Sequence, residues 1–220
     1  MSGHTTEDLA VVAASLRRAE LFVRVNPVNA GTTAEIETVL GHGAQVLMLP
    51  YFRTAGEVET FVRLVDGRAA VMILVETASA LVRIREILAV PGVCEVMVGL
   101  NDLRLELGVR NHFEVLVSPL MDAVAREVRA AKLPFSIGGV GRVDDVSLPV
   151  SPNLVLAQYA RLGATGAWIS RSFFECVPAD WDFGDAVASI RRRLTEWADA
   201  SPEALEQARD ELSLHARLWR

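Results

Sequence analysis

The chain alternates short apolar segments with segments that have the periodicity of amphipathic helices. Because a strand can follow a parallel neighbour only after a crossover connection, this alternation is typical of a parallel sheet covered by helices. It predicts an α/β fold with two further helices at the C-terminal end. The expected strands cover residues 21–26, 45–50, 69–75, 94–100, 134–139 and 166–174. The expected helices cover 6–19, 32–41, 57–65, a segment opened by Thr77 or Ser79 that stops before Pro91, roughly 114–131, a segment from Ser151–Pro152 to Gly163, about 182–199, and 202–219, which Ser201–Pro202 opens.

The length of 220 residues suits one α/β domain with a substantial core. We therefore expect a single domain over residues 1–220, with an N-terminal helix within 1–20 and the C-terminal helices within 182–220. The segment from 103 to 110 is expected to be irregular. No GxGxxG motif follows the first strand and no GxxxxGK[ST] motif occurs, so nucleotide-binding Rossmann and P-loop folds lack support.

Charge and composition exclude several classes of partner. The formal net charge is −6 and no basic block is present, so nucleic acid is not an expected partner. The apolar runs are too short to span a bilayer, and the polar N-terminus does not resemble a secretory signal. The two cysteines, Cys94 in an expected buried strand and Cys176, are interpreted as reduced thiols. These features predict a cytoplasmic protein that does not bind a membrane.

Lys132 is the only lysine in the chain. It precedes the strand at 134–139, and so it lies at the edge of the sheet opposite to the carboxyl ends of the strands. A Schiff-base mechanism requires a desolvated lysine inside the active-site pocket. The position of Lys132 therefore argues against imine-forming aldolases and pyridoxal phosphate enzymes.

Two carboxylates follow two consecutive predicted strands. Glu76 comes after the strand at 69–75, and Asp102 comes shortly after the strand at 94–100. A helical segment joins the strands, so both carboxylates are expected at the carboxyl edge of a parallel sheet, where α/β folds bind ligands. Oxygen ligands in small number suit Mg²⁺ or Mn²⁺. The alternative for Glu76 is a helix cap before Thr77.

Several other residues are candidates at the same edge. Arg24, near the end of the first strand, is placed to bind a carboxylate or stabilise an enolate, or else is a surface arginine. His112 is the one histidine that follows a site strand, but the start of a helix explains it better than a catalytic base does. The candidate substrate-binding residues are Arg24, Gly99, Leu100, Asn101, Gly138 and Ser170, although tight turns explain the glycines equally well and Ser170 can simply close the sheet.

These residues and their surrounding motifs resemble the HpcH/HpaI aldolase and citrate lyase β-subunit family. The resemblance extends over nearly the whole chain from residue 20, and a short branch found among sugar and capsule-type biosynthetic proteins matches at 137–142 and 161–173. The matching motifs are VRVNP (23–27), GAQVLMLP (43–50), TAGEV (54–58), VETASA (75–80), AVPGV (89–93) and GLNDLRLELG (99–108).

The resemblance implies a TIM-barrel fold and divalent-metal-dependent cleavage or condensation of carbon–carbon bonds. By resemblance, Glu76 and Asp102 match the metal-binding carboxylates, and Arg24 matches the arginine that contacts a pyruvate-like oxyanion. The implied reaction is a lyase or aldolase reaction on a small 2-oxo acid with an aldehyde partner, in which the metal stabilises an enolate. A second possibility is the same enolate chemistry on an acyl-CoA thioester, as in citrate lyase.

The chain also departs from the family pattern. Two barrel strands are missing before the VRVNP strand, so the barrel is expected to have six strands, and the usual proton-transfer group has no matching position. Leu74 replaces a glutamine of some aldolases, Tyr51–Phe52 follow Leu49–Pro50 in place of lysine or valine, and Arg104 replaces a common serine. A third possibility is therefore a binding or scaffold subunit without turnover. Open sheet edges must be covered, which predicts a homo-oligomer.

Overall fold

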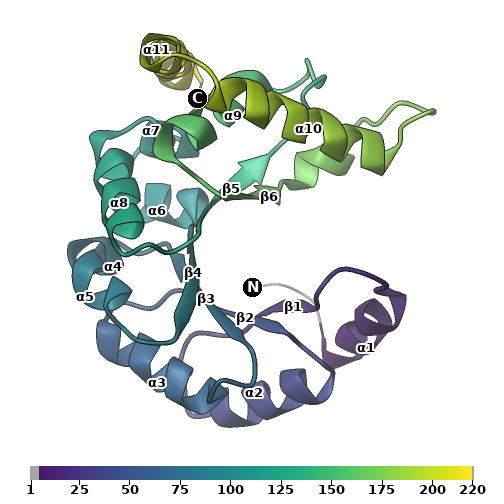
Figure 1. The fold of residues 1–220 in the computed structure, drawn as a ribbon, viewed down its shortest axis with the longest axis vertical. Helices are drawn as coiled ribbons and strands as arrows, with labels where there is room; N and C mark the ends of the chain where they lie inside the picture. The colour runs from purple at the N-terminus through teal and green to yellow at the C-terminus, as the bar shows by residue number, and fades with distance from the viewer. Residues whose placement is uncertain (1–4, 220) are drawn as a thin grey trace. The chain divides into compact units, whose positions relative to one another are not determined.

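The computed structural model describes residues 5–219, and Figure 1 shows its helices and strands. The chain consists of two compact units, one ending at Met97 and the other beginning at Val98. The first unit contains α1 (Thr6–Ser15), β1 (Phe22–Arg24), α2 (Thr32–Gly41), β2 (Val46–Leu49), α3 (Ala55–Val65), β3 (Ala70–Val75), α4 (Ala78–Val82), α5 (Ile84–Leu88) and β4 (Val93–Val98), whose last residue already belongs to the second unit. The second contains α6 (Leu100–Leu107), α7 (His112–Leu116), α8 (Pro119–Ala130), β5 (Phe135–Val140), α9 (Pro152–Leu162), β6 (Gly166–Ile169), the 3₁₀ helix η1 (Arg171–Phe174), α10 (Phe183–Ala198) and α11 (Pro202–Leu218).

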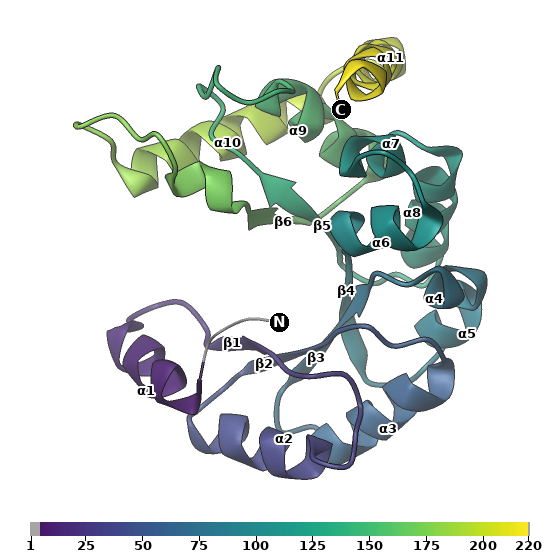
Figure 2. The same ribbon diagram turned by 180° about the vertical axis from the view of Figure 1, so that it is seen from behind.

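The sheet of the first unit is parallel from β1 to β3. Val23 pairs with Leu47, which in turn pairs with Val71. Residues 71–75 of β3 are all buried, which is the pattern of a parallel strand covered on both faces. Both views show α2 and α3 along one face of these strands (Figure 1, Figure 2). The strands therefore end together at one edge, where Arg24 ends β1 and the loops carry Tyr51 and Glu76.

Helix α3 illustrates how local sequence sets the elements of this unit. Thr54 and Glu57 form a capping box, in which the Thr54 side chain accepts the Glu57 N–H and Glu57 accepts the Thr54 N–H. The buried residues Val58, Phe61 and Val65 recur at helical spacing on one face. The capping box begins the helix directly after the loop at 50–53, so it helps to position that loop at the carboxyl end of β2.

The second unit is built around the parallel pair β5–β6 and the helices beside it. The pairing shifts register between Ile137 and Val140, where Gly139 has φ of +91°. Helix α9 packs on β5, and α11 packs on both α9 and α7. Ala208, Leu212 and Ala216 form the buried stripe of α11. The predicted amphipathic character of this helix is therefore confirmed.

Two predictions about the middle of the chain are wrong. The segment expected to be irregular forms helix α6, which ends at Gly108 in the left-handed conformation with φ of +67°. The single helix expected over 114–131 is two helices, α7 and α8, because Ser118 caps a new helix with Pro119 at its first position. Leu100, Asn101 and Asp102 therefore lie in the first turn of a helix rather than at the end of a strand or in a loop.

Two further expectations need correction. The last strand is shorter than the predicted 166–174, because β6 ends at Ile169 and residues 171–174 form a 3₁₀ helix. Cys94 lies in β4 as expected, but its residue is exposed rather than buried, and both cysteines are free thiols. Within residues 5–219, no helix is long and apolar enough to cross a membrane. The single domain over residues 1–220 stays a prediction.

Candidate active site

The carboxyl ends of β1, β2 and β3 bring three candidate residues to one edge of the first unit. Arg24 is the last residue of β1 and pairs with Met48 of β2, and Val25 donates its N–H to the Met48 carbonyl at 3.1 Å. Tyr51 follows β2 after a single proline, and Glu76 directly follows β3. Parallel strands end on the same side of a sheet, so these three residues share the edge at which α/β folds bind their ligands.

Glu76 is a buried carboxylate with a defined backbone partner. Only 5% of its surface is exposed, and its Oε1 accepts the Tyr51 N–H at 3.0 Å. A buried carboxylate is costly unless hydrogen bonds, charges or a metal compensate it. The Tyr51 amide supplies part of this compensation and fixes the orientation of the carboxyl group.

The alternative role of Glu76 as a helix cap is wrong. Thr77 caps α4, since its Oγ1 accepts the Ala80 N–H at 3.1 Å. The same hydroxyl donates to the Phe52 carbonyl at 2.8 Å, which ties the start of α4 to the loop after β2. The capping function is therefore satisfied by the next residue, and the burial of Glu76 needs another explanation.

The loop after β2 contains a strained residue that sequence analysis did not identify as a functional one. Tyr51 has φ of +54°, which is uncommon for an aromatic residue and is often found where a site constrains the backbone. Arg53 lies over the Tyr51 ring with its guanidinium carbon 5.3 Å from the ring centroid. The strained conformation is the one in which the Tyr51 N–H meets Glu76. The Pro–Tyr sequence at this position does not predict the positive φ of Tyr51.

Arg24 is exposed at the end of β1 and forms no ion pair with any residue in the range 5–219. The loop that follows is held by Glu35, whose Oε1 accepts both the backbone N–H of Asn26 at 3.0 Å and its side-chain amide at 2.8 Å. The guanidinium thus extends from an anchored segment and is available to an anionic ligand. This arrangement is consistent with the binding role expected of Arg24, which stays a prediction.

Asp102 lies in the second unit, in the first turn of α6, and is half-buried. Gly99 caps this helix, Leu100 is buried, and the Oδ1 atom of Asn101 accepts a hydrogen bond from Arg104 Nε at 3.2 Å. A carboxylate in the first turn of a helix interacts favourably with the helix dipole. Because Glu76 belongs to the first unit, the pairing of these two carboxylates around one metal ion stays a prediction.

Three other candidates lie in the second unit. Gly138 is half-buried in β5, and the Ser170 hydroxyl donates to the Val140 carbonyl at 2.9 Å. This bond favours the interpretation in which Ser170 closes the sheet. His112 begins α7, as expected, and its ring contacts that of Trp219 at 5.6 Å. Burial, and secondarily the nearby Arg104, lower the pKa of His112.

The chemistry of the candidate ligands fits a magnesium-type ion. In the part of the chain that the structure describes, no group of three or more His, Cys, Asp or Glu residues is placed to hold a metal. Mg²⁺ needs few protein ligands, because it keeps several waters or substrate oxygens and binds through one or two carboxylates. The buried, oriented carboxylate of Glu76 suits such a site, with Asp102 as the expected second ligand.

Comparison with solved structures defines the class of fold. The HpcH/HpaI aldolase from Desulfitobacterium hafniense superposes with a TM-score of 0.64 at 17% identity, covering 91% of this chain and 82% of its own. The citrate lyase β subunit from M. tuberculosis, complexed with oxaloacetate and magnesium, gives a TM-score of 0.61 at 18% identity, covering 88% and 83%. A citrate lyase from Burkholderia xenovorans gives 0.65 at 17% identity, covering 99% and 71%. The predicted α/β fold of TIM-barrel type, shortened to six parallel strands, is confirmed.

The sequence itself identifies the family. The sequence model described as HpcH/HpaI aldolase/citrate lyase matches residues 4–137. The chain therefore belongs to the HpcH/HpaI aldolase/citrate lyase family, as its motifs indicated. The match includes Arg24, Glu76 and Asp102 and ends before the motif at 161–173. A comparison with curated proteins gave no match.

Proposed function

We propose that this protein is a divalent-metal-dependent carbon–carbon lyase or aldolase that forms a pyruvate-type enolate from a small 2-oxo acid. The observation that carries the proposal is Glu76, a carboxylate that is 5% exposed at the end of β3 and held by a backbone N–H. Family membership supports the same class of reaction. The magnesium and pyruvate named for one citrate lyase relative from M. tuberculosis support the choice of metal and substrate.

Each residue has a distinct role in the proposed site. Glu76 and Asp102 hold the cation, and a bound divalent cation would act as a Lewis acid on the keto oxygen. The exposed guanidinium of Arg24 binds the substrate carboxylate and thereby orients the carbon that becomes the enolate. The Tyr51 N–H keeps Glu76 in one orientation, which limits reorganisation when the ligand binds.

Metal binding is tested directly by titration with Mn²⁺, and the binding is measured by electron paramagnetic resonance and by calorimetry. Glu76→Gln and Asp102→Asn each remove one negative charge and are expected to abolish saturable binding. Glu59→Gln makes the same charge change at an exposed position of α3 and serves as the matched control. Unchanged Mn²⁺ affinity in both site variants would contradict the assignment.

Enolate formation is tested by incubating the protein with Mg²⁺ and pyruvate in D₂O. Enolisation removes a methyl proton from pyruvate, and return of deuterium then reduces the methyl signal in the proton NMR spectrum. We expect exchange with the wild type, no exchange with Glu76→Gln, and strongly reduced exchange with Arg24→Gln. Metal binding without any exchange would refute the pyruvate chemistry and favour a scaffold subunit.

An acyl-CoA thioester is the second candidate substrate. It is supported by the acetoacetate and coenzyme A named for another M. tuberculosis relative, which has a TM-score of 0.60 at 19% identity and covers 77% of its own chain. Competition between coenzyme A and pyruvate for the Mg²⁺-loaded protein separates the two candidates. Displacement of pyruvate by coenzyme A would favour the thioester.

A further inference from the structure

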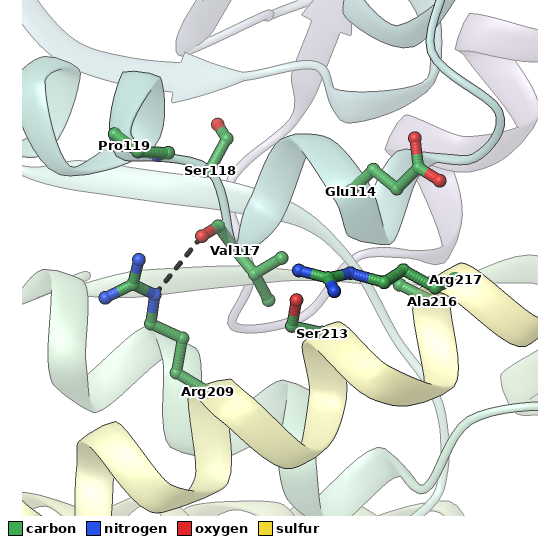
Figure 3. A pocket seen from close by; sticks show the side chains of 8 residues that line it. All are labelled: Glu114, Val117, Ser118, Pro119, Arg209, Ser213, Ala216 and Arg217. Atoms are coloured by element: carbon green, nitrogen blue, oxygen red, sulfur yellow. Dashed lines mark hydrogen bonds between the residues drawn. The ribbon is translucent and has the colours of Figure 1, made fainter.

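The second unit contains a cavity of about 360 Å³ between α11 and the connection from α7 to α8. Figure 3 shows Val117, Ser118 and Pro119 on one side and four residues of α11 on the other, namely Arg209, Ser213, Ala216 and Arg217. The volume lies in the range of sites for small organic ligands, which is about 300–1,000 Å³. None of the residues proposed for enolate chemistry lines it, so the cavity needs an explanation of its own.

The α11 side of the cavity is a regular stripe of polar residues. Arg209, Ser213 and Arg217 follow one another at a spacing of four, which places them on one face of the helix. In Figure 3 the Arg217 side chain extends towards Ser213, while the Arg209 guanidinium lies on the other side of Val117. The two guanidinium groups therefore flank a serine hydroxyl at the cavity wall.

The charges around the cavity are only partly balanced. Arg209 is neutralised in part, because its Nη1 pairs with Glu206 at 2.8 Å and its Nε donates to the Val117 carbonyl at 3.3 Å. Glu114 is engaged by Arg110, with 3.7 Å between Nε and the carboxylate. The Arg217 guanidinium has no hydrogen-bond or ion-pair partner among residues 5–219. One positive charge is left over, together with the donors of Arg209.

We propose that this cavity binds a small phosphorylated organic molecule. Arginine guanidinium groups offer several N–H donors in a planar fork that suits phosphate oxygens, and a serine hydroxyl adds a further donor. Val117, Pro119 and Ala216 supply an apolar wall for the organic part of the ligand. A carboxylate offers fewer oxygens to the three polar residues and binds more weakly than a phosphate monoester of the same size.

Binding at this place joins two segments of the second unit. The ligand contacts α11 through Arg209 and Arg217 and contacts the start of α8 through the connection at 117–119. A ligand that binds only the folded state raises the free energy of unfolding by RT ln(1 + L/Kd), where L is the concentration of free ligand. Phosphate binding is therefore expected to raise the unfolding temperature, and salt is expected to reduce the effect.

The test uses phenyl phosphate, inorganic phosphate and benzoate as probes. Their binding to the full chain is measured by calorimetry and by thermal unfolding. We expect saturable binding of phenyl phosphate, weaker binding of inorganic phosphate, and the weakest binding of benzoate. Arg217→Gln, which removes a guanidinium that has no hydrogen-bond or ion-pair partner within residues 5–219, is expected to weaken phenyl phosphate binding about tenfold. Ser213→Leu, which fills the cavity without a change of charge, is expected to abolish it.

Arg191→Gln on α10 is the matched control, since it removes the same charge at an exposed position outside the cavity. It is expected to leave phenyl phosphate affinity unchanged. No saturable binding by the wild type would overturn the proposal, as would equal weakening by Arg191→Gln and Arg217→Gln. Benzoate affinity equal to that of phenyl phosphate would overturn the choice of a phosphorylated ligand.

Discussion

The hydrogen bond between Glu76 and the Tyr51 amide allows the structural and metal-binding roles of Glu76 to be separated by two substitutions. In the wild type the Tyr51 N–H lies 3.0 Å from Glu76 Oε1. Glu76→Gln keeps the shape of the side chain and an oxygen that can accept this N–H. Glu76→Ala removes the acceptor entirely. Both variants lose the negative charge that a divalent cation requires, so both are expected to lose metal binding.

The expected difference in stability follows from what the alanine variant leaves behind. An unsatisfied, partly buried N–H costs about 1–2 kcal/mol, and the lost burial of one methylene group costs about 0.8 kcal/mol. Glu76→Ala is therefore expected to be about 2–3 kcal/mol less stable than Glu76→Gln in the absence of metal. For a chain of this size, that difference lowers the unfolding temperature by about 5–10 °C.

The measurement is thermal unfolding of the two variants and the wild type in the presence of a chelator, paired with Mn²⁺ calorimetry. We expect Glu76→Gln to unfold close to the wild type and Glu76→Ala to unfold clearly earlier, while neither binds metal. Equal unfolding temperatures for the two variants would refute the idea that Glu76 supports the strained loop at Tyr51. Metal binding by Glu76→Gln would refute its role as a ligand.

Substitutions at and around three further residues, Gly92, Asn111 and His112, test other parts of the structure. Gly92→Ala is expected to cost about 2–4 kcal/mol in chemical unfolding, because φ is +95° and the added Cβ would lie 2.6 Å from Val62; Val62→Ala should recover part of that loss. Asn111→Asp keeps the α7 cap but loses the amide donor to the Ala216 carbonyl at 2.8 Å, which should lower the free energy of unfolding. Asn111→Ala should lower it by about a further 1 kcal/mol, because the cap is lost as well. Burial lowers the pKa of His112 below its ordinary value near 6.5, so the folded state binds fewer protons than the unfolded state and stability falls as pH drops below about 6.5. Denaturant unfolding is measured at pH 7.5 and 5.5. The free energy of unfolding should fall less between these pH values for His112→Gln than for the wild type. An equal fall in both proteins would exclude His112 as a cause of the pH dependence.

Helix boundaries were predictable where a local signal marked them. Ser151–Pro152 and Ser201–Pro202 were identified as helix starts, and α9 and α11 begin at those prolines. Ser118–Pro119 has the same signal, but the amphipathic pattern around it continues without interruption, and the break between α7 and α8 was missed. Periodicity reports which face of a segment is apolar. It does not show where one helix ends and a second helix with the same apolar pattern begins.

The candidate site was only partly accessible from sequence. Glu76 stands out because a carboxylate directly after an apolar strand is unusual, and its burial agrees with that signal. The hydrogen bond from Tyr51 to Glu76 could not be predicted, because the backbone amide donates it and the identity of the side chain at position 51 does not indicate it. The exposure of Cys94 was missed for a related reason, since an apolar strand pattern does not specify what covers each residue.

The backbone origin of the bond to Glu76 also makes residue 51 a useful position for engineering. Tyr51 is 40% exposed, whereas its amide holds the buried carboxylate of Glu76. Replacement of the aromatic ring therefore alters the surface beside Glu76 without removing that support. Gly and Asn tolerate the positive φ best and are the natural first members of a library that selects for bulkier substrates.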